Sequence, residues 1–153
     1  MVKTLAHDAC TAEIVRRLRT LRPDTPRLWG RMSSHQTICH LADGYRMAVG
    51  QKRVAETGGP LHRTVLKALV LYGPLRWPAG VPTSPELDQR HEGTTPAEFA
   101  SDLLELERLL AFLCSRPADF RWSRHPVFGR MSRAWWLRWG YLHADHHLRQ
   151  FGT

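Results

Sequence analysis

The sequence predicts an all-α fold. We expect a single four-helix-bundle domain over residues 1–153, with an extra short helix and a long loop rich in proline and glycine between the second and third helices of the bundle. Two observations support this fold class. Apolar residues recur at helical spacing in several long segments, whereas the alternation typical of strands is almost absent. Capping residues and helix breakers bound these segments, and no internal repeat or linker divides the chain.

The first two predicted helices have clear start and stop signals. The first begins at Asp8, which we expect to be its N-cap, and Pro23 stops it. The second starts near Ser33 or Ser34 and extends to about Gly50. The apolar stripe of the first helix consists of Cys10, Ile14, Leu18 and Leu21.

The extra short helix is predicted from Leu61 to Gly73, where Gly73-Pro74 ends it. The following segment, as far as Gly93, contains too many prolines and glycines for a helix or a central strand. We therefore expect a long ordered loop there. Loops of this length inside a compact domain are often functional, for example as lids or interfaces.

The remaining two bundle helices also begin at recognisable caps. Residues 95–98, Thr-Pro-Ala-Glu, form a capping-box pattern with proline at the first helical position. The helix that follows is expected to end at Arg116-Pro117. Ser132 is the predicted N-cap of the last helix, and Gly152 closes it. One face of the third bundle helix carries Phe99, Leu103, Leu106, Leu110 and Leu113.

Composition and charge limit the class of protein. No apolar run reaches eighteen residues and the N-terminus lacks a secretory signal pattern, so we expect neither a membrane span nor export. The three cysteines are scattered without a Cys-x-x-Cys pair, which favours reduced thiols and a cytoplasmic location. A net charge of +8 admits an anionic small molecule or nucleic acid as partner. No nucleic-acid-binding motif accompanies the charge, so we expect no nucleic-acid partner.

Two histidines of the last predicted helix have the spacing of metal ligands. His143 and His147 are four residues apart, so their Cβ atoms lie about 5–6 Å apart on one face. This spacing lets two imidazoles bind one cation at about 2.0–2.1 Å. Trp136 and Phe151 lie on the same stripe, which indicates that the histidines point inward. The alternative, with nine histidines in the chain, is a chance pair on a solvated helix end.

A third histidine completes the predicted site. His40 lies on the inward stripe of the second helix with Thr37 and Met47. Bundle cores commonly build metal sites from facing helices, so we predict that His40, His143 and His147 bind one divalent metal ion. Three neutral imidazoles leave a coordination position for water or substrate, which is typical of a catalytic site.

Two glycines stand one helical turn from these histidines. Gly44 follows His40 and Gly140 precedes His143, both inside helices, where glycine costs about 1 kcal/mol relative to alanine. We expect these glycines to leave space for a metal ion, a water molecule or a substrate.

Other polar residues near the predicted ligands have two interpretations each. Gln36, Asp43 and Gln150 orient the ligands through hydrogen bonds, or they are ordinary polar residues of a helix. His146 lies beside the ligands or at an interface. His125 reaches the mouth of the pocket or serves a turn.

Three further groups are expected to stay outside the site. His35 is off the ligand stripe and is interpreted as a cap-region or surface residue. Cys39 lies about 100° around the helix from His40 and is expected to be a small buried hydrophobe. Trp135, Trp136 and Trp139 are expected to pack the core and a dimer interface, and an aromatic ligand box is the alternative.

The chain resembles a known superfamily along its whole length. The segment MSSHQTICHLADGYRMAVG resembles the second helix of the DinB-like metal-binding four-helix bundles, and YLHADHHLRQFG resembles their last helix. The WPAGVPTSPEL and HPVFG loops resemble those of a functionally uncharacterised branch. The resemblance implies a divalent ion, often zinc or nickel, on His40, His143 and His147, and frequent homodimers. Characterised relatives include thiol-dependent transferases and a maleylpyruvate isomerase that uses a low-molecular-weight thiol.

We compare three classes of function, of which the first is the leading hypothesis. The first is a metal-dependent enzyme acting on a small molecule, either a thiol-dependent S-transferase or a metal-assisted hydrolase. The second is a non-catalytic metal-binding or ligand-binding module. The third is a nucleic-acid-binding bundle, which a continuous arginine face would favour. An open coordination position favours the enzyme, and a fourth protein ligand favours the module.

Overall fold

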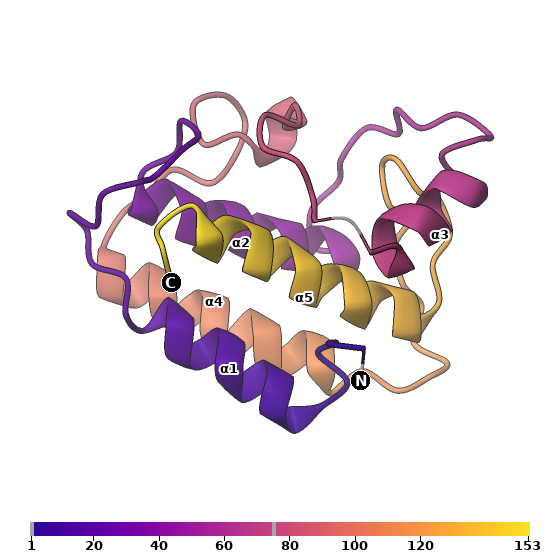
Figure 1. Ribbon diagram of the computed structural model, residues 1–153, viewed down its shortest axis with the longest axis horizontal. Coiled ribbons are helices and arrows are strands. Elements are labelled where there is room, and N and C mark those ends of the chain that lie inside the picture. Colours follow the sequence, from indigo (N-terminus) through magenta and orange to yellow (C-terminus); the bar gives the residue numbers. More distant parts are fainter. Residues whose placement is uncertain (1, 75) are drawn as a thin grey trace.

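The computed structural model describes residues 2–74 and 76–153, and within these ranges the chain is all-helical (Figure 1). An isolated bridge between His125 and Gly129 is the sole β-type pairing of the described chain. Within the same ranges, no helix has the length and apolarity needed to cross a membrane. The helices are α1 (Asp8–Leu18), α2 (Ser34–Ala48), α3 (Val65–Tyr72), the 3-10 helix η1 (Pro85–Leu87), α4 (Phe99–Cys114) and α5 (Arg133–Arg149).

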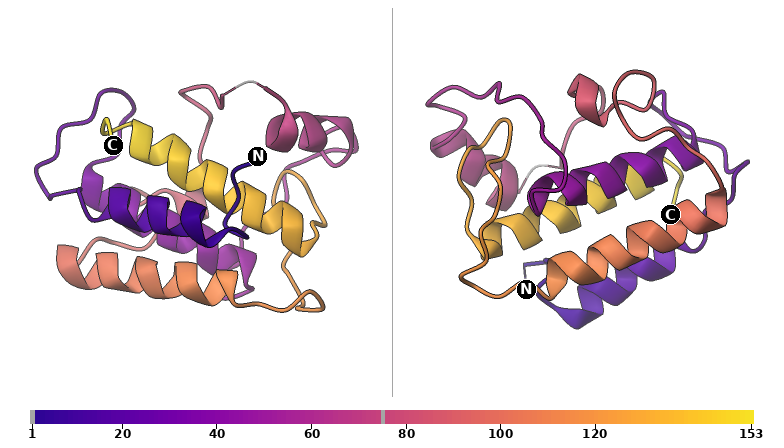
Figure 2. Two further views of the ribbon diagram at one scale, coloured as in Figure 1. Left: turned by 60° about the horizontal axis from the view of Figure 1, so that its bottom comes forward. Right: turned by 180° about the vertical axis from the view of Figure 1, so that it is seen from behind.

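The four longer helices lie alongside one another, and the core lies between them (Figures 1 and 2). Helix α2 packs against α4, α1 packs against α5, and α2 also contacts α5. The short helix α3 lies outside this group, against α5. Fully buried side chains from all four longer helices fill the interior, among them Ile14, Ile38, Tyr45, Leu106, Leu110, Leu113 and Trp136.

Two of the predicted helix starts are confirmed. Ser33 and Gln36 form a capping box at α2: the Ser33 hydroxyl accepts from the Gln36 backbone N–H, and the Gln36 side chain accepts from the Ser33 N–H. Gln36 is thereby occupied at the helix start and does not orient a histidine. Ser132 is the N-cap of α5 and accepts from the backbone of Trp135.

The other two predicted starts were wrong. The N-cap of α1 is His7, without a side-chain cap, and Asp8 is the first helical residue. The N-cap of α4 is Glu98, whose carboxylate accepts from the N–H groups of Ala100 and Ser101. Residues 95–98 stay extended because Asp43 holds Thr94 through its backbone N–H (2.7 Å) and hydroxyl (2.6 Å), so the chain turns into the helix only after Glu98.

The segment between α3 and α4 crosses over α2. Helix α3 begins four residues later than predicted, after turns at residues 60–64. Residues 76–98 contain η1 and no α-helix, and Leu75, inside the predicted loop, lies outside the described residues. The loop is tied to α2 because the buried Asp43 carboxylate accepts from Gln89 (3.3 Å) as well as from Thr94.

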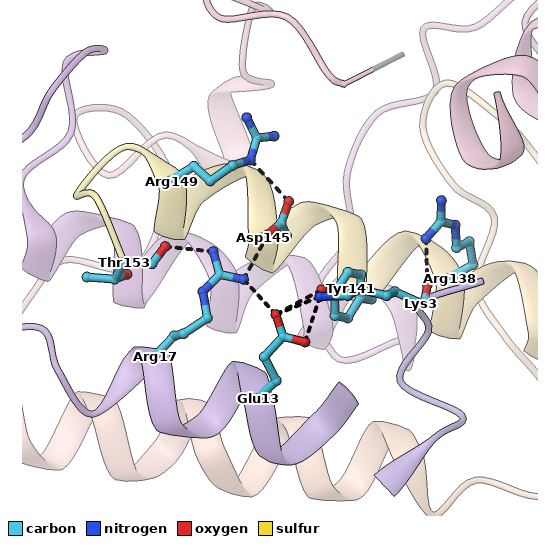
Figure 3. A network of polar contacts seen from close by, with 8 residues as sticks. All are labelled: Lys3, Glu13, Arg17, Arg138, Tyr141, Asp145, Arg149 and Thr153. Carbon is cyan, nitrogen blue, oxygen red and sulfur yellow. Dashed lines mark hydrogen bonds and ion pairs between the residues drawn. The ribbon is translucent and has the colours of Figure 1, made fainter. Parts of the chain in front are cut away.

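A polar network joins α1 to α5 on the side shown in Figure 3. The Arg17 guanidinium, with a side chain only 10% exposed, donates to Asp145 and to the backbone carbonyl of Thr153, both at 2.7 Å. Glu13 accepts from Lys3 (2.9 Å) and from the Tyr141 hydroxyl (3.2 Å). These bonds fix α5, which carries two of the predicted ligands, to the first helix.

Candidate metal centre

Helices α2 and α5 bring the three predicted ligands together in the buried core. Each of His40, His143 and His147 offers one nitrogen, and these nitrogens all lie within 4.8 Å of one another. The Nε2 atoms of His40 and His143 are 3.0 Å apart. None of the three residues is more than 7% exposed. The inward orientation predicted from the helical stripes is therefore confirmed.

Gly44 lets the His143 ring lie close to the backbone of α2. A Cβ atom at position 44 would lie 3.0 Å from Cε1 and 3.2 Å from Nδ1 of His143, and 3.2 Å from the Trp139 ring. The glycine thus leaves space for a ligand ring. Because His143 Nδ1 has no hydrogen-bond partner within the described residues, its ring is positioned by packing against Gly44 and Trp139.

The expectation for Gly140 was wrong. A Cβ atom there would lie 2.8 Å from Leu5 Cδ1 and 3.3 Å from Leu113 Cδ2. The glycine faces the apolar core under α5, so it makes room for the side chain of Leu5 and not for a metal ion or a substrate.

Hydrogen bonds set the tautomers of two of the three imidazoles. His40 Nδ1 lies 2.8 Å from the backbone carbonyl of Leu87, which can only accept, so Nδ1 carries the hydrogen and Nε2 presents its lone pair. His147 Nδ1 lies 2.7 Å from Oε1 of Gln150, which fixes that ring in the same way. Such bonds to a carbonyl are the usual means by which proteins orient metal-ligating histidines.

Burial keeps all three rings neutral. Desolvation lowers the pKa of His40 and lowers the pKa values of His143 and His147 well below the ordinary value. The neighbouring imidazoles lower the pKa values of His143 and His147 further, because two adjacent cations would repel. Neutral imidazole is the form that binds a metal ion.

The spacing of the ring nitrogens fits a metal ion. Two nitrogens bound to one ion at about 2.0–2.1 Å, with about 90–110° between them, lie about 2.9–3.4 Å apart. The 3.0 Å between the His40 and His143 nitrogens falls in this range. The donor set of three imidazoles suits zinc and nickel and does not suit magnesium or calcium, which prefer oxygen.

A pocket of about 660 Å³ reaches the cluster from the C-terminal end of α5. His147, His146 and Gln150 line it on the helix side. Residues 29–32, residues 79–83 and the pair Asp88 and Arg90 form the opposite walls. Its volume is within the range of about 300–1,000 Å³ usual for small-molecule sites. His147 thus belongs to both the histidine cluster and the pocket wall.

His146 lies beside the cluster and is not one of the three grouped ligands. It is buried and packs edge-on against Trp29, with ring centroids 5.0 Å apart. Burial lowers its pKa to about 4, so it is neutral near pH 7. Its contact with the pocket confirms the interpretation of a residue beside the ligands.

Two other candidates serve the scaffold. His125 has a turn role, because its Nδ1 accepts from the backbone N–H groups of Val127 (3.1 Å) and Phe128 (3.2 Å). Burial lowers its pKa to about 3. Asp43 holds the loop over α2 and contacts no histidine ligand by hydrogen bond. Of the three proposed orienting residues, only Gln150 has that role.

Sequence reasoning missed two parts of the site. One is the carbonyl of Leu87, which orients His40. The other is Gly30, whose φ of +83° and lack of a Cβ let the Gln150 side chain approach: a Cβ there would lie 2.5 Å from Gln150 Nε2. A glycine in the segment between two predicted helices marks a position where a positive φ is allowed, and this was the usable signal for Gly30. Nothing in the sequence marks a particular backbone carbonyl.

The fold and the site define an all-helical protein with a buried three-histidine cluster that opens to a pocket. The model of a family described as "Protein of unknown function (DUF1569)" matches residues 3–153, and the chain belongs to this family. No curated protein and no solved structure matches the chain.

Proposed function

We propose that this protein is a metal-dependent enzyme in which His40, His143 and His147 hold one divalent ion, zinc or nickel. The observation that carries the proposal is the cluster itself: three buried neutral imidazoles with their nitrogens within 4.8 Å, two of them oriented by bonds at Nδ1. The resemblance of α2 and α5 to the DinB-like four-helix bundles supports the same ligand set and a single bundle domain.

The ligand count favours a catalytic over a structural ion. Among residues 2–74 and 76–153 the cluster contains three ligands and no fourth carboxylate, thiol or imidazole. When bound, a divalent ion with an open position lowers the pKa of a bound thiol or water and so supplies a nucleophile near neutral pH. His147 and Gln150, which line the pocket, set where a substrate meets the cluster.

One of the two arginines that line the pocket suits it to an anionic small molecule. Arg90 is bound to Asp88 at 2.9 Å, so its charge is largely neutralised. Arg31 is exposed at the pocket wall and forms no ion pair with any residue of the described ranges. We infer that Arg31 binds a carboxylate or another anionic group of the substrate or of a thiol co-substrate.

The reaction we favour is S-transfer from a low-molecular-weight thiol. In it, the S–H bond breaks and the sulfur forms a bond to an electrophilic carbon of the substrate. The electron pair of the bond broken at that carbon leaves with a departing group, which takes up the thiol proton. Support comes from the resemblance to thiol-dependent transferases and from a pocket of the size usual for small-molecule sites. Metal-assisted hydrolysis is the alternative, with water in place of the thiol. The homodimer, the cytoplasmic location and the absence of a nucleic-acid partner stay predictions.

Metal analysis of protein purified without a histidine tag tests the proposal. We expect about one ion per chain at this site in the parent, and its loss in His40→Ala and His147→Ala. His7→Ala, which removes an exposed histidine far from the cluster in sequence, is the control. A screen of small thiols with electrophilic acceptors then separates transfer from hydrolysis. Equal metal content in His147→Ala and parent would refute the metal centre. Metal binding without turnover of thiols or esters would favour the non-catalytic module.

A further inference from the structure

A second cluster of metal-ligating side chains lies on another side of α2. His35 and Cys39 are four residues apart on this helix, and Asp102 approaches them from α4. One ligand atom from each lies within 4.8 Å of the others. His35 Nε2 is 2.7 Å and Cys39 Sγ is 3.7 Å from the same carboxylate oxygen, Oδ2 of Asp102. The sequence interpretation had placed His35 and Cys39 outside any site.

This cluster is independent of the three-histidine centre. Cys39 and His40 are consecutive, so their side chains leave α2 about 100° apart. Cys39 faces α4 through Asp102, whereas His40 faces α5 through His143. The two groups share no residue.

The spacing is close to that of a tetrahedral zinc site. With Zn–S of about 2.3 Å and Zn–N or Zn–O of about 2.0–2.1 Å, tetrahedral ligands lie about 3.5 Å apart for S and O, and about 3.3 Å for N and O. The observed Sγ–Oδ2 distance is 3.7 Å. The His35–Asp102 pair, at 2.7 Å, would have to open by about 0.6 Å. His35 and Asp102 are partly exposed, by 20% and 22%, and Oδ2 of Asp102 also accepts from the Ala97 N–H, so most of this opening has to come from the His35 side chain.

We propose that His35, Cys39 and Asp102 form a second divalent metal site, selective for zinc or a similar borderline ion. The donor set of nitrogen, sulfur and oxygen excludes magnesium and calcium. On binding, the Cys39 thiol proton passes to solvent and the sulfur binds the ion. The thiolate and the carboxylate then balance the two positive charges, unlike the neutral three-histidine set. This balance suits an ion that joins α2 to α4 more than one that activates a substrate.

Cobalt titration of the metal-free, full-length protein tests this proposal. A thiolate bound to Co²⁺ gives a charge-transfer absorption in the near ultraviolet, which a site made only of histidines cannot give. We expect two Co²⁺ ions per chain in the parent, with this absorption. Cys39→Ser should lose the absorption and one ion, and Asp102→Asn should weaken binding of that ion. Cys114→Ser, which removes a cysteine outside the cluster, is the matched control and should keep both.

The same titration distinguishes this site from the three-histidine centre. His147→Ala should lose one ion and keep the charge-transfer absorption. If the absorption is absent in the parent at saturating Co²⁺, or persists in Cys39→Ser, the second site is wrong whatever the outcome at the histidines. If His147→Ala loses no ion while Cys39→Ser does, the proposed centre fails and the second site stands. Circular dichroism confirms that each variant is folded.

Discussion

Replacing Gln150 by leucine removes the acceptor that orients His147 and keeps the volume of the side chain nearly unchanged. Oε1 of Gln150 lies 2.7 Å from Nδ1 of His147, and a leucine side chain has no atom that can accept this bond. Loss of such an orienting partner typically weakens metal binding by about 10–100-fold. At about 1.4 kcal/mol per tenfold change, this corresponds to about 1.4–2.8 kcal/mol.

Competition with a chromogenic chelator at pH 7.5 measures this change. We expect Gln150→Leu to bind Zn²⁺ at the three-histidine centre about 10–100-fold more weakly than the parent. Gln51→Leu makes the same substitution at an exposed position and should bind like the parent. Gly30→Ala should shift affinity in the same direction as Gln150→Leu, because its Cβ would displace Gln150 Nε2. Parent-like affinity in Gln150→Leu would refute the orienting role.

Three further outcomes follow from the structure. With chelator present, the free energy of unfolding should fall as pH drops below about 6.5, by up to about 1.4 kcal/mol per pH unit for each buried histidine. The reason is that these histidines become protonated in the unfolded chain, whereas burial lowers their pKa and keeps them neutral in the folded protein. Denaturant titrations at several pH values measure this free energy, and its dependence on pH should be weaker in His143→Gln than in the parent. An equal pH dependence would contradict the conclusion that His143 is buried in its neutral form. Gly44→Ala should weaken metal binding because its Cβ would press on the His143 ring. Gly140→Ala should change the thermal midpoint and leave metal content unchanged, because its Cβ would meet Leu5 in the apolar core. The reverse pattern would show that Gly140, and not Gly44, makes room at the metal site. Arg17→Met should lower the free energy of unfolding by about 1.5–3 kcal/mol through loss of its bonds to Asp145 and to the backbone carbonyl of Thr153, without affecting metal stoichiometry. A change below about 0.5 kcal/mol would show the network to be unimportant.

Periodicity predicted the helices well and their exact starts less well. The stripes of α1 and α4 identified the buried faces because each of these helices buries one side against the others. Helices α2 and α5 are buried around most of their circumference, so their stripes marked only part of the buried surface. The start of α4 was misplaced because the capping-box pattern at residues 95–98 competes with a tertiary contact. Asp43, fifty-one positions away from Thr94, holds that segment extended. Local propensity carries no information on such a contact.

In the candidate site, too, the sequence predicted the positions of the ligands but not the groups that face them. Helical spacing placed His143 and His147 on one face, and the inward stripe of α2 placed His40 opposite them. Spacing gives the direction in which a residue points and not the identity of what faces it. For this reason Gly44 and Gly140 had the same interpretation in the sequence, although one faces a ligand ring and the other faces Leu5.

The bond between His40 and the carbonyl of Leu87 has a consequence for how this family can diverge. A backbone carbonyl is the same whatever side chain follows it, so substitutions at position 87 or along residues 76–86 can leave the bond in place. An insertion or a deletion in that stretch would carry the carbonyl away from the ring. Since residues 79–83 of the same loop also form a wall of the pocket, exposed side chains there can change with the molecule bound, whereas a change in loop length would displace the partner of His40.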